Sequence, residues 1–277
     1  WTSPPSTQGY LTLSTLKAIE MLSAEHDDIH KVIETYRIFA ADRDNITYDY
    51  GKNIEDFKGV DVNYIQEKIK LFNPNQSEKF DFPKPHGGGT AYMNTVDKNG
   101  LGVSLIQSNF YGIGSRIGVE SFGFFLHNRG CGFNLDSGHP NYLTPGRKPL
   151  HTLSPTIWSK NGNLEFIAGT RGGRYQPQLL IQTILPYIKN SDSFEKIIKE
   201  PRWVIENFSN DTLSKLRFEK IDNEDLEILL QKGHEVEVDN KFNKAYGPIS
   251  IIYKKDDGNF EGVCDVRVGT EKVFNSF

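Results

Sequence analysis

One threonine in this sequence would become a catalyst if the chain were cut directly before it. Thr90 follows three glycines in the stretch HGGGTAYMNTV and precedes an expected strand. A threonine hydroxyl is a poor nucleophile unless a nearby base takes its proton. Cutting the bond between Gly89 and Thr90 would create an α-amine with a pKa of roughly 8, which is such a base. Glycine permits the strained backbone that such a cut needs. A flexible hinge that enters a sheet is the alternative interpretation.

Two other segments supply groups that acyl transfer uses. Gly172 and Gly173 precede an expected helix, so their N–H groups would lie near its positive end and could stabilise an oxyanion. Ser108 ends an expected strand, and the hairpin would return its hydroxyl toward Thr90. Each feature has an ordinary alternative. The glycines could form a plain strand-to-helix turn, and the serine could make a local hydrogen bond at a sheet edge.

The histidines do not indicate a metal site. His26 and His30 are four residues apart on an expected helix, a spacing that metal sites use. No glutamate or third ligand completes the set, so we expect no metal and no cofactor. His127 is expected to be a core histidine, with a place in the site as the alternative.

The elements that must position these residues change type at Thr90. Before it, the hydrophobic period predicts helices, followed by an exposed linker rich in Pro and Gly at residues 73–89. After it, alternation and turn signals predict hairpins, and the apolar run at 122–128 is typical of a buried strand. Antiparallel hairpins beside segregated helices favour a layered α/β or α+β fold. The expected helices are 10–22, 27–45, 63–72, 176–188 and 224–232, and the expected strands are 92–96, 102–108, 122–128, 154–159, 164–170 and a hairpin at 249–266.

The composition is that of a folded protein. The chain has 277 residues, of which 37% are hydrophobic and 25% are charged. A net charge of -4 gives no electrostatic footprint for nucleic acid, and no apolar run approaches the length of a membrane span. Two cysteines, Cys131 and Cys264, do not make a disulfide framework, although one bridge between them stays open.

The start of the chain identifies no compartment. It has neither an initiator methionine nor the basic and apolar regions of a signal peptide. We expect the chain to be a processed product or a fragment, and the cytoplasm is the weakly favoured location.

Six motifs in one order resemble the γ-glutamyltranspeptidases, a family of the N-terminal nucleophile hydrolase superfamily. The motifs are TSPPSTQG, YRIFAADRDN, GTAYMNTVDKNGLGVSLIQSNFYGIGS, PGRKPLHTLSPTIW, AGTRGGRYQPQ and NFEGVCDVRVGT. The resemblance implies a four-layer αββα fold that is truncated at its N-terminus. Residues 1–89 would be the C-terminal part of the large subunit with its linker. Residues 90–277 would be the small, catalytic subunit, and the two parts would form one domain.

The resemblance also implies a role for each reactive residue. Thr90 takes the position of the nucleophile that self-cleavage after Gly89 releases. Ser108 takes the position of a hydroxyl residue that orients this nucleophile. Gly172 and Gly173 take the positions of the glycines that form the oxyanion hole.

Substrate-binding positions follow from the same resemblance. His151 and Thr152 take the place of a serine pair that holds the substrate α-carboxylate, and Asn109 matches a substrate-contacting asparagine. Arg129 and Gly132 depart from the transpeptidases, which have a glutamine and an ammonium-binding aspartate there. Arg129 offers a forked cation suited to a carboxylate, with a surface salt bridge as the alternative. This variant is similar to the subgroup that includes glutaryl-cephalosporin acylases.

We therefore expect an enzyme similar to γ-glutamyltransferases and glutathione hydrolases. It would cleave γ-glutamyl or glutaryl-like amide bonds through an acyl-enzyme on Thr90, with hydrolysis favoured over transfer. A zymogen would become a heterodimer of large and small subunits by self-cleavage, without nucleic acid or membrane as a partner. The alternative is a non-catalytic, unprocessed member that serves as a binding or structural protein.

Overall fold

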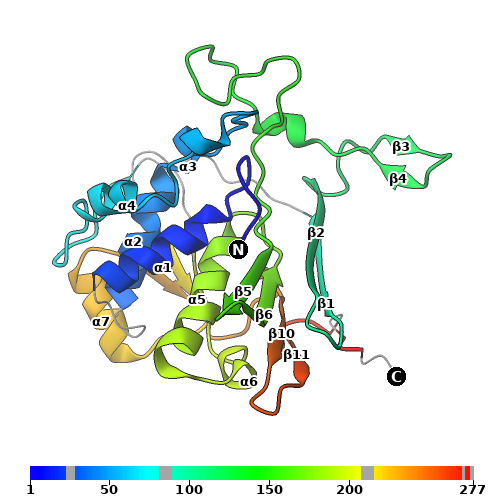
Figure 1. Ribbon diagram of the computed structural model, residues 1–277. Coiled ribbons are helices and arrows are strands. Elements are labelled where there is room, and N and C mark those ends of the chain that lie inside the picture. The colour runs from blue at the N-terminus through cyan, green and yellow to red at the C-terminus, as the bar shows by residue number, and fades with distance from the viewer. Residues whose placement is uncertain (23–28, 81–88, 207–214, 270–271, 275–277) are drawn as a thin grey trace.

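The computed structural model describes residues 1–22, 29–80, 89–206, 215–269 and 272–274. Figure 1 shows a layer of helices, then a four-stranded sheet, and then a two-stranded hairpin on the far side of that sheet. The helices are α1 (Tyr10–Met21), α2 (Ile29–Ala41), α3 (Arg43–Ile46), α4 (Val62–Ile69), α5 (Tyr175–Asn190), α6 (Phe194–Ile197) and α7 (Asn223–Gln231), with short 3₁₀ turns η1 (Ile54–Asp56) and η2 (Arg129–Gly132).

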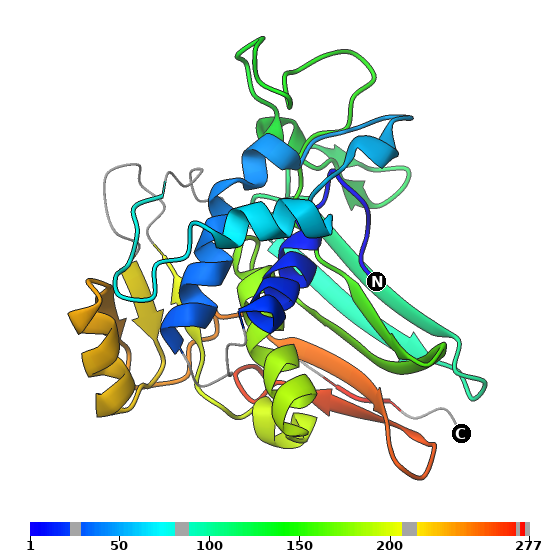
Figure 2. The ribbon, with the colours of Figure 1, turned by 60° about the vertical axis from the view of Figure 1, so that its left-hand side comes forward.

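The helices form where the hydrophobic period predicted them. α1 and α5 lie side by side on one face of the four-stranded sheet (Figures 1 and 2). Leu11 and Ile19 of α1 belong to the same buried cluster as Ile181 of α5. The helix expected at 27–45 is interrupted, because α2 ends at Ala41 and α3 begins at Arg43.

The four-stranded sheet is antiparallel, in the order β11-β10-β6-β5. One face of α5 packs on it, so Leu180 and Ile184 share a cluster with Phe166, Ile249 and Ile251 of the strands. The sheet therefore forms the rigid support from which the loop after β6 leaves. Its strands are β5 (Thr156–Lys160), β6 (Asn163–Thr170), β10 (Ile249–Lys254) and β11 (Phe260–Cys264).

The hairpin of β1 (Gly89–Val96) and β2 (Gly102–Phe110) stacks on the other face of this sheet. Tyr92 lies over Gly169 of β6, where an added Cβ would be only 2.0 Å from the tyrosine ring. Asn94 donates to the carbonyl oxygen of Ser250 at 3.2 Å. Because side chains alternate along a strand, Thr90 shares this inward face with Tyr92 and Asn94.

The outward face of the hairpin is apolar and exposed. Met93, Val103 and Leu105 keep 55%, 47% and 49% of their surface accessible. Met93 is paired with Leu105 across the two strands, which makes the exposed surface continuous. Within the part of the chain that the structure describes, helices cover only one side of the two stacked sheets. Three of the four expected layers are thus in place.

The prediction of a buried strand at 122–128 is wrong. Only Phe124–Phe125 (β4) is a strand, and it pairs with Gly118–Val119 (β3) in an arm that projects from the body (Figure 1). Phe122 is 77% exposed and Phe124 is 49% exposed. An apolar run signals burial only if the chain returns to the core, and this arm turns away from it.

A third sheet was not expected from the sequence. It consists of β7 (Trp203–Ile205), β8 (Lys215–Phe218) and β9 (Glu235–Val238), in which β8 and β9 run parallel. These strands are short, and two of them carry alternating charged residues that hide the apolar pattern. Leu216 and Phe218 nevertheless point into the core beside α1 and α2.

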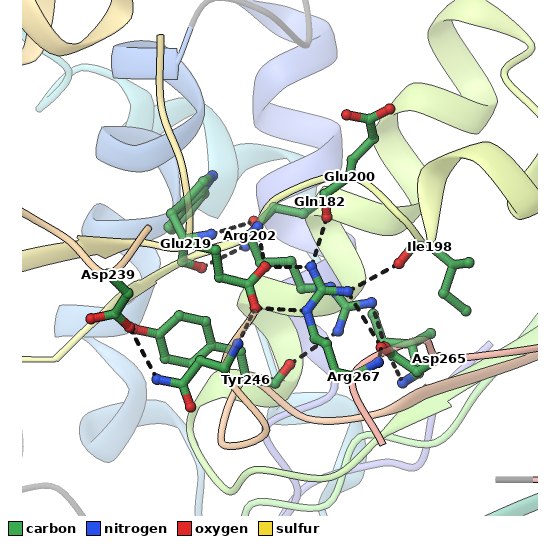
Figure 3. A network of polar contacts seen from close by, with 12 residues as sticks. Gln182, Ile198, Glu200, Arg202, Glu219, Asp239, Tyr246, Asp265 and Arg267 are labelled. Atoms are coloured by element: carbon green, nitrogen blue, oxygen red, sulfur yellow. Dashed lines mark hydrogen bonds and ion pairs between the residues drawn. The ribbon is translucent and has the colours of Figure 1, made fainter. Parts of the chain in front are cut away.

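A buried ionic network joins this third sheet to the C-terminal segment (Figure 3). Arg267 forms an ion pair with Glu219 and contacts Asp265 at 3.3 Å. The guanidinium of Arg202 contacts Asp265 at 2.6 Å, and the backbone N–H of Arg202 donates to Glu219 at 2.9 Å. Two cations face two carboxylates, so the charge of the cluster is balanced although its side chains are almost inaccessible to water.

The structure bears on three further expectations. Cys131 and Cys264 are free thiols, so the bridge left open by the sequence is not formed. The expected linker is described only to residue 80, and residues 81–88 lie outside the described part. Among the described residues, no helix combines the length and apolar character needed to cross a membrane.

Candidate functional site

The bond between Gly89 and Thr90 lies at an irregularity in the hairpin. Thr90 is paired with Ser108, whereas Gly89 is paired with Phe110, so the register shifts at this bond. Phe110 is almost fully buried and has a φ of 79°, which is unfavourable for a bulky side chain. The hairpin therefore places a backbone irregularity at the bond that the sequence singled out.

Ser108 contacts the carbonyl group of that bond. Its hydroxyl donates to the Gly89 carbonyl oxygen at 2.8 Å and accepts from the N–H of Phe110 at 3.0 Å. The structure thus brings Thr90 and Ser108 together, as predicted. The serine contacts the carbonyl oxygen on which charge would develop if the Gly89 carbonyl carbon were attacked.

Glycine is required before the threonine for a steric reason as well. A Cβ on Gly89 would lie 2.5 Å from the carbonyl oxygen of Gly112. The backbone of the loop after β2 therefore lies so close to Gly89 that a side chain at this position would not fit.

Gly172 and Gly173 form the turn between β6 and α5. Their φ values are 118° and 57°, a region that side chains disfavour. The Gly172 carbonyl accepts from the N–H of Tyr175 at 3.0 Å, which turns the chain into the helix. Among the described residues, no acceptor is found for the N–H of either glycine. Gly172 is partly exposed and Gly173 is buried, and unpaired N–H groups at the start of a helix favour an anion.

The stacking of β1 on β6 places Thr90 near this turn. Asn94 contacts the carbonyl oxygen of Ile167 at 3.5 Å, and Tyr92 lies over Gly169. The two strands therefore run in opposite directions across the stack. Asn94 lies opposite Ile167 and Tyr92 lies opposite Gly169. Continuing this register places Thr90 opposite Arg171, directly before Gly172 and Gly173.

Arg129 lies behind Ser108 and is 7% exposed. Its Nη2 donates to the Ser108 carbonyl oxygen at 3.3 Å, and its guanidinium carbon is 5.3 Å from the centre of the Phe110 ring. Nη1 is buried and has no hydrogen-bond partner among the described residues. Burial lowers the pKa of this guanidinium. The alternative of a surface salt bridge is therefore wrong.

Gly132 follows Arg129 in the η2 turn and leaves no room for a side chain. A Cβ there would lie 2.5 Å from the carbonyl oxygen of Leu150. An aspartate would fit at this position only if the backbone moved. The same close approach brings the η2 turn against the segment that carries His151.

His151 is uncharged at neutral pH. Burial lowers its pKa to about 4, and the positive charges of Arg129 and Lys148 contribute. Its Nδ1 accepts from the N–H of Leu153 at 3.4 Å, which leaves Nε2 to carry the proton. Thr152 beside it is 4% exposed. A neutral histidine next to a buried arginine offers a hydrogen-bond donor without adding a second cation.

Asn109 is held at the base of the projecting arm. Its side-chain amide donates to the Ile113 carbonyl at 3.4 Å, and its own carbonyl accepts from Asn128 at 3.2 Å. It lies between Ser108, which is paired with Thr90, and Phe110, which is paired with Gly89, and is therefore the residue skipped at the register shift.

Gln8 was not anticipated as a site residue. Its Nε2 donates to the Thr152 carbonyl at 2.9 Å and to the Gly173 carbonyl at 2.8 Å. It therefore joins the segment of His151 and Thr152 to the glycine turn. These partners are 144 and 165 positions away in the sequence, so only its membership of the TSPPSTQG motif singled it out.

The histidines occupy other surroundings. His26 lies outside the described residues, and His30 contacts Nε2 of His234 and the carbonyl of Asn73, each at 2.9 Å. His127 is exposed, so the expectation of a core histidine is wrong, and its Nδ1 accepts from the Arg129 N–H. The described residues contain no group of three or more His, Cys, Asp or Glu side chains that could hold a metal ion.

Comparison with known proteins gives consistent matches across the chain. The family model described as "Gamma-glutamyltranspeptidase" matches residues 1–274. The chain is 30% identical to the glutathione hydrolase-like YwrD proenzyme of Bacillus subtilis and 31% identical to the oxamate amidohydrolase proenzyme of Klebsiella pneumoniae. Each match covers 96% of this chain and 52% of the relative. The chain thus spans about half the length of these relatives.

The solved structures support the same assignment. The cephalosporin acylase from Bacillus halodurans superposes with a TM-score of 0.82 at 26% identity, over 96% of this chain and 49% of that chain. This likeness confirms the N-terminal nucleophile hydrolase fold that the motifs predicted. The chain belongs to the γ-glutamyltranspeptidase family.

Proposed function

We propose that this chain is the catalytic part of an amidohydrolase that activates itself by cleavage between Gly89 and Thr90. Residues 1–89 then belong to the large subunit and residues 90–277 form the small subunit, within one domain. The observation that carries the proposal is the hydrogen bond from Ser108 to the Gly89 carbonyl, at the bond where the strand register shifts. The matched relatives are named as hydrolases, which gives no support to the non-catalytic alternative.

The cleavage step begins with attack on the Gly89 carbonyl carbon by the hydroxyl oxygen of Thr90. Negative charge builds up on the Gly89 oxygen, where the Ser108 hydroxyl stabilises it. The peptide C–N bond then breaks, the nitrogen of Thr90 leaves as an amine, and Gly89 remains attached to the threonine oxygen as an ester. Water hydrolyses this ester, which leaves a carboxylate on Gly89 and a free amine and hydroxyl on Thr90.

The mature site uses the same hydroxyl on an external amide. The free α-amine of Thr90 takes the hydroxyl proton as the oxygen attacks the substrate carbonyl. The N–H groups of Gly172 and Gly173 stabilise the oxyanion. The leaving amine takes a proton from the Thr90 ammonium, and water then resolves the acyl-enzyme by hydrolysis. No cofactor takes part in these steps.

Arg129 indicates the class of substrate. A buried guanidinium with an unused N–H pairs best with a carboxylate. The charge of Arg129 acts on His151, Thr152 follows His151, and Asn109 follows Ser108; we propose that these residues complete the substrate site. We therefore propose substrates that are amides of small dicarboxylic acids, of the γ-glutamyl or glutaryl type. The Klebsiella relative is named for oxamate, which is also a small amide that carries a carboxylate.

The test measures hydrolysis of glutaryl, γ-glutamyl and acetyl p-nitroanilide by the full-length protein. The two carboxylate-bearing substrates should be hydrolysed, and Arg129→Met should raise their KM by about 10- to 100-fold, the loss of one charge-assisted pair. The acetyl substrate should be unaffected by this change. Because Gly132 replaces an ammonium partner, the γ-glutamyl ammonium should give no advantage over glutaryl.

Arg116→Met is the matched control, because Arg116 is exposed on the projecting arm. It should leave all three rates unchanged. Equal loss of all activities in Arg129→Met, or hydrolysis of acetyl as fast as glutaryl, would contradict the proposed substrate class.

A further inference from the structure

Gln8 lies at the start of α1 and is 1% exposed. Both protons of its side-chain amide are used, one on the Thr152 carbonyl and one on the Gly173 carbonyl. Its Oε1 accepts from Nη1 of Arg43 at 3.4 Å. Because arginine can only donate and the two carbonyls can only accept, these three neighbours fix which way the amide faces.

The glycine turn needs such an external restraint. Two adjacent glycines have more backbone freedom than any other pair, and ordering them costs more conformational entropy. The Gly172 carbonyl is held by the N–H of Tyr175, and the Gly173 carbonyl is held by Gln8 and, at 3.3 Å, by the N–H of Gln176. In a trans peptide the N–H points opposite to the carbonyl, so the held Gly172 carbonyl sets the direction of the Gly173 N–H. The Gly173 carbonyl belongs to the next peptide, so Gln8 fixes the C-terminal side of the turn and limits rotation of the backbone about Gly173.

The other end of the contact reaches the substrate-binding segment. The Thr152 carbonyl is held by the same nitrogen atom that holds Gly173, which keeps the two loops at a fixed separation. We propose that Gln8 is a positioning residue, which aligns the oxyanion-binding turn with the segment of His151 and Thr152. This inference rests on the proposed function, because it assigns the two loops the roles given there.

The chain offers a matched control for the loss of this amide. Gln182 of α5 also donates through Nε2 to two carbonyls, those of Gln178 at 3.0 Å and Trp203 at 2.9 Å. Its contacts join α5 to β7, away from both loops. Each glutamine also accepts one hydrogen bond, Gln8 from the Arg43 guanidinium and Gln182 from the backbone N–H of Trp203. Gln8→Met and Gln182→Met therefore each remove two donated bonds and one accepted bond, but only Gln8→Met frees the glycine turn.

Steady-state kinetics and hydrogen exchange test the inference together. Gln8→Met should lower kcat by about 10- to 100-fold, more than it changes KM, because oxyanion donors act in the transition state. Gln182→Met should keep kcat within about twofold of the parent. Exchange at the Tyr175 and Gln176 amides should become faster in Gln8→Met only. Should Gln8→Met fail to fold, Gln8→Asn replaces it, since its shorter amide cannot reach both carbonyls.

The two readouts separate the inference from the proposed function. A parent protein that hydrolyses none of the anilides contradicts the proposed function, and the exchange measurement still decides whether Gln8 restrains the turn. Unchanged exchange at Tyr175 and Gln176 in the Gln8 variant overturns the inference. So does a kcat loss that is equal in the Gln8 and Gln182 variants.

Discussion

The hydroxyl of Ser108 makes its two hydrogen bonds at the one place where the hairpin loses its regular register. It donates to Gly89 and accepts from Phe110, whose backbone is in an unfavourable conformation. The serine therefore has a donor proton directed at the carbonyl that Thr90 would attack. We therefore propose a role for Ser108 in the cleavage step itself, beyond orienting the threonine afterwards.

Replacing Ser108 by alanine should slow self-cleavage by at least about tenfold, because one donor to the developing oxyanion is lost. Denaturing electrophoresis of the protein over time after synthesis measures the rate. Ser104→Ala is the control, since Ser104 lies on the same strand and face but its hydroxyl forms a hydrogen bond with the Tyr92 hydroxyl, at 2.9 Å, away from the Gly89–Thr90 bond. Equal cleavage rates in the two variants would show that the Ser108 contact is not used.

The candidate reactive residues could be proposed from the sequence, but the contacts that support them could not. Thr90, Ser108 and the glycines stand in short motifs whose spacing the chain displays directly. Gln8 and the stacking of Arg129 on Phe110 depend on contacts between segments far apart in sequence. The burial of Arg129 was also not evident, because an arginine followed by the glycines of the RGCG stretch is typical of a surface turn.

At the scale of elements, the ionic network of Figure 3 connects parts that the sequence left unassigned. Glu219, at the end of β8, accepts from Arg267 and from the backbone of Arg202. Removing its charge leaves Arg267 buried with one carboxylate partner fewer. Glu219→Gln should therefore lower the free energy of unfolding by about 3 kcal/mol.

Chemical denaturation at neutral pH measures that change. Lys215→Met is the comparison, because the Lys215–Glu237 pair on the same sheet is partly exposed and should contribute less than about 1 kcal/mol. A Glu219 variant as stable as the Lys215 variant would show that the network is not a source of stability.

The free energy of unfolding should depend on pH through His234, which lies directly before β9 and contacts His30 of α2. His234 is 3% exposed, and burial, followed by the charge of Arg37, lowers its pKa to about 3. The unfolded state, with a histidine pKa of about 6.5, binds one proton more between pH 6.5 and 3. Falling pH therefore favours unfolding across this window, and the His234 contribution lost by pH 5 is about 2 kcal/mol.

His234→Gln retains a polar group near His30 but cannot titrate. Its free energy of unfolding should fall less between pH 8 and pH 5 than that of the parent, by about 2 kcal/mol. Denaturation curves at the two pH values give the difference. An identical pH dependence in the two proteins would show that His234 is not the group responsible.

Most expected helices and hairpins were predicted correctly, whereas the three-stranded sheet and the β3–β4 arm were not. α1, α5 and the hairpin of β1 and β2 appear where their patterns placed them. The three-stranded sheet was missed because β7 has three residues and β8 and β9 have four each, too few to display a period. The apolar arm at 122–128 was misassigned because hydrophobicity alone does not show whether the chain returns to the core.

At the scale of the whole molecule, the exposed apolar faces agree with the length comparison. The chain covers about half of the relatives that it matches. Apolar side chains are exposed on the β1–β2 hairpin and on the β3–β4 arm, and the arm projects from the body (Figure 1). We expect both to be covered by further sequence of a longer protein, as the fourth layer of the fold.

The central claim is that Thr90 becomes an N-terminal nucleophile. Intact mass of the purified protein, combined with N-terminal sequencing, tests it most directly. The parent should give two fragments, one of which begins at Thr90 and contains the chain through Phe277, whereas Thr90→Ala should remain a single chain. A folded parent protein in which residues 89 and 90 stay bonded would contradict the claim, because the amine that the mechanism requires would be absent.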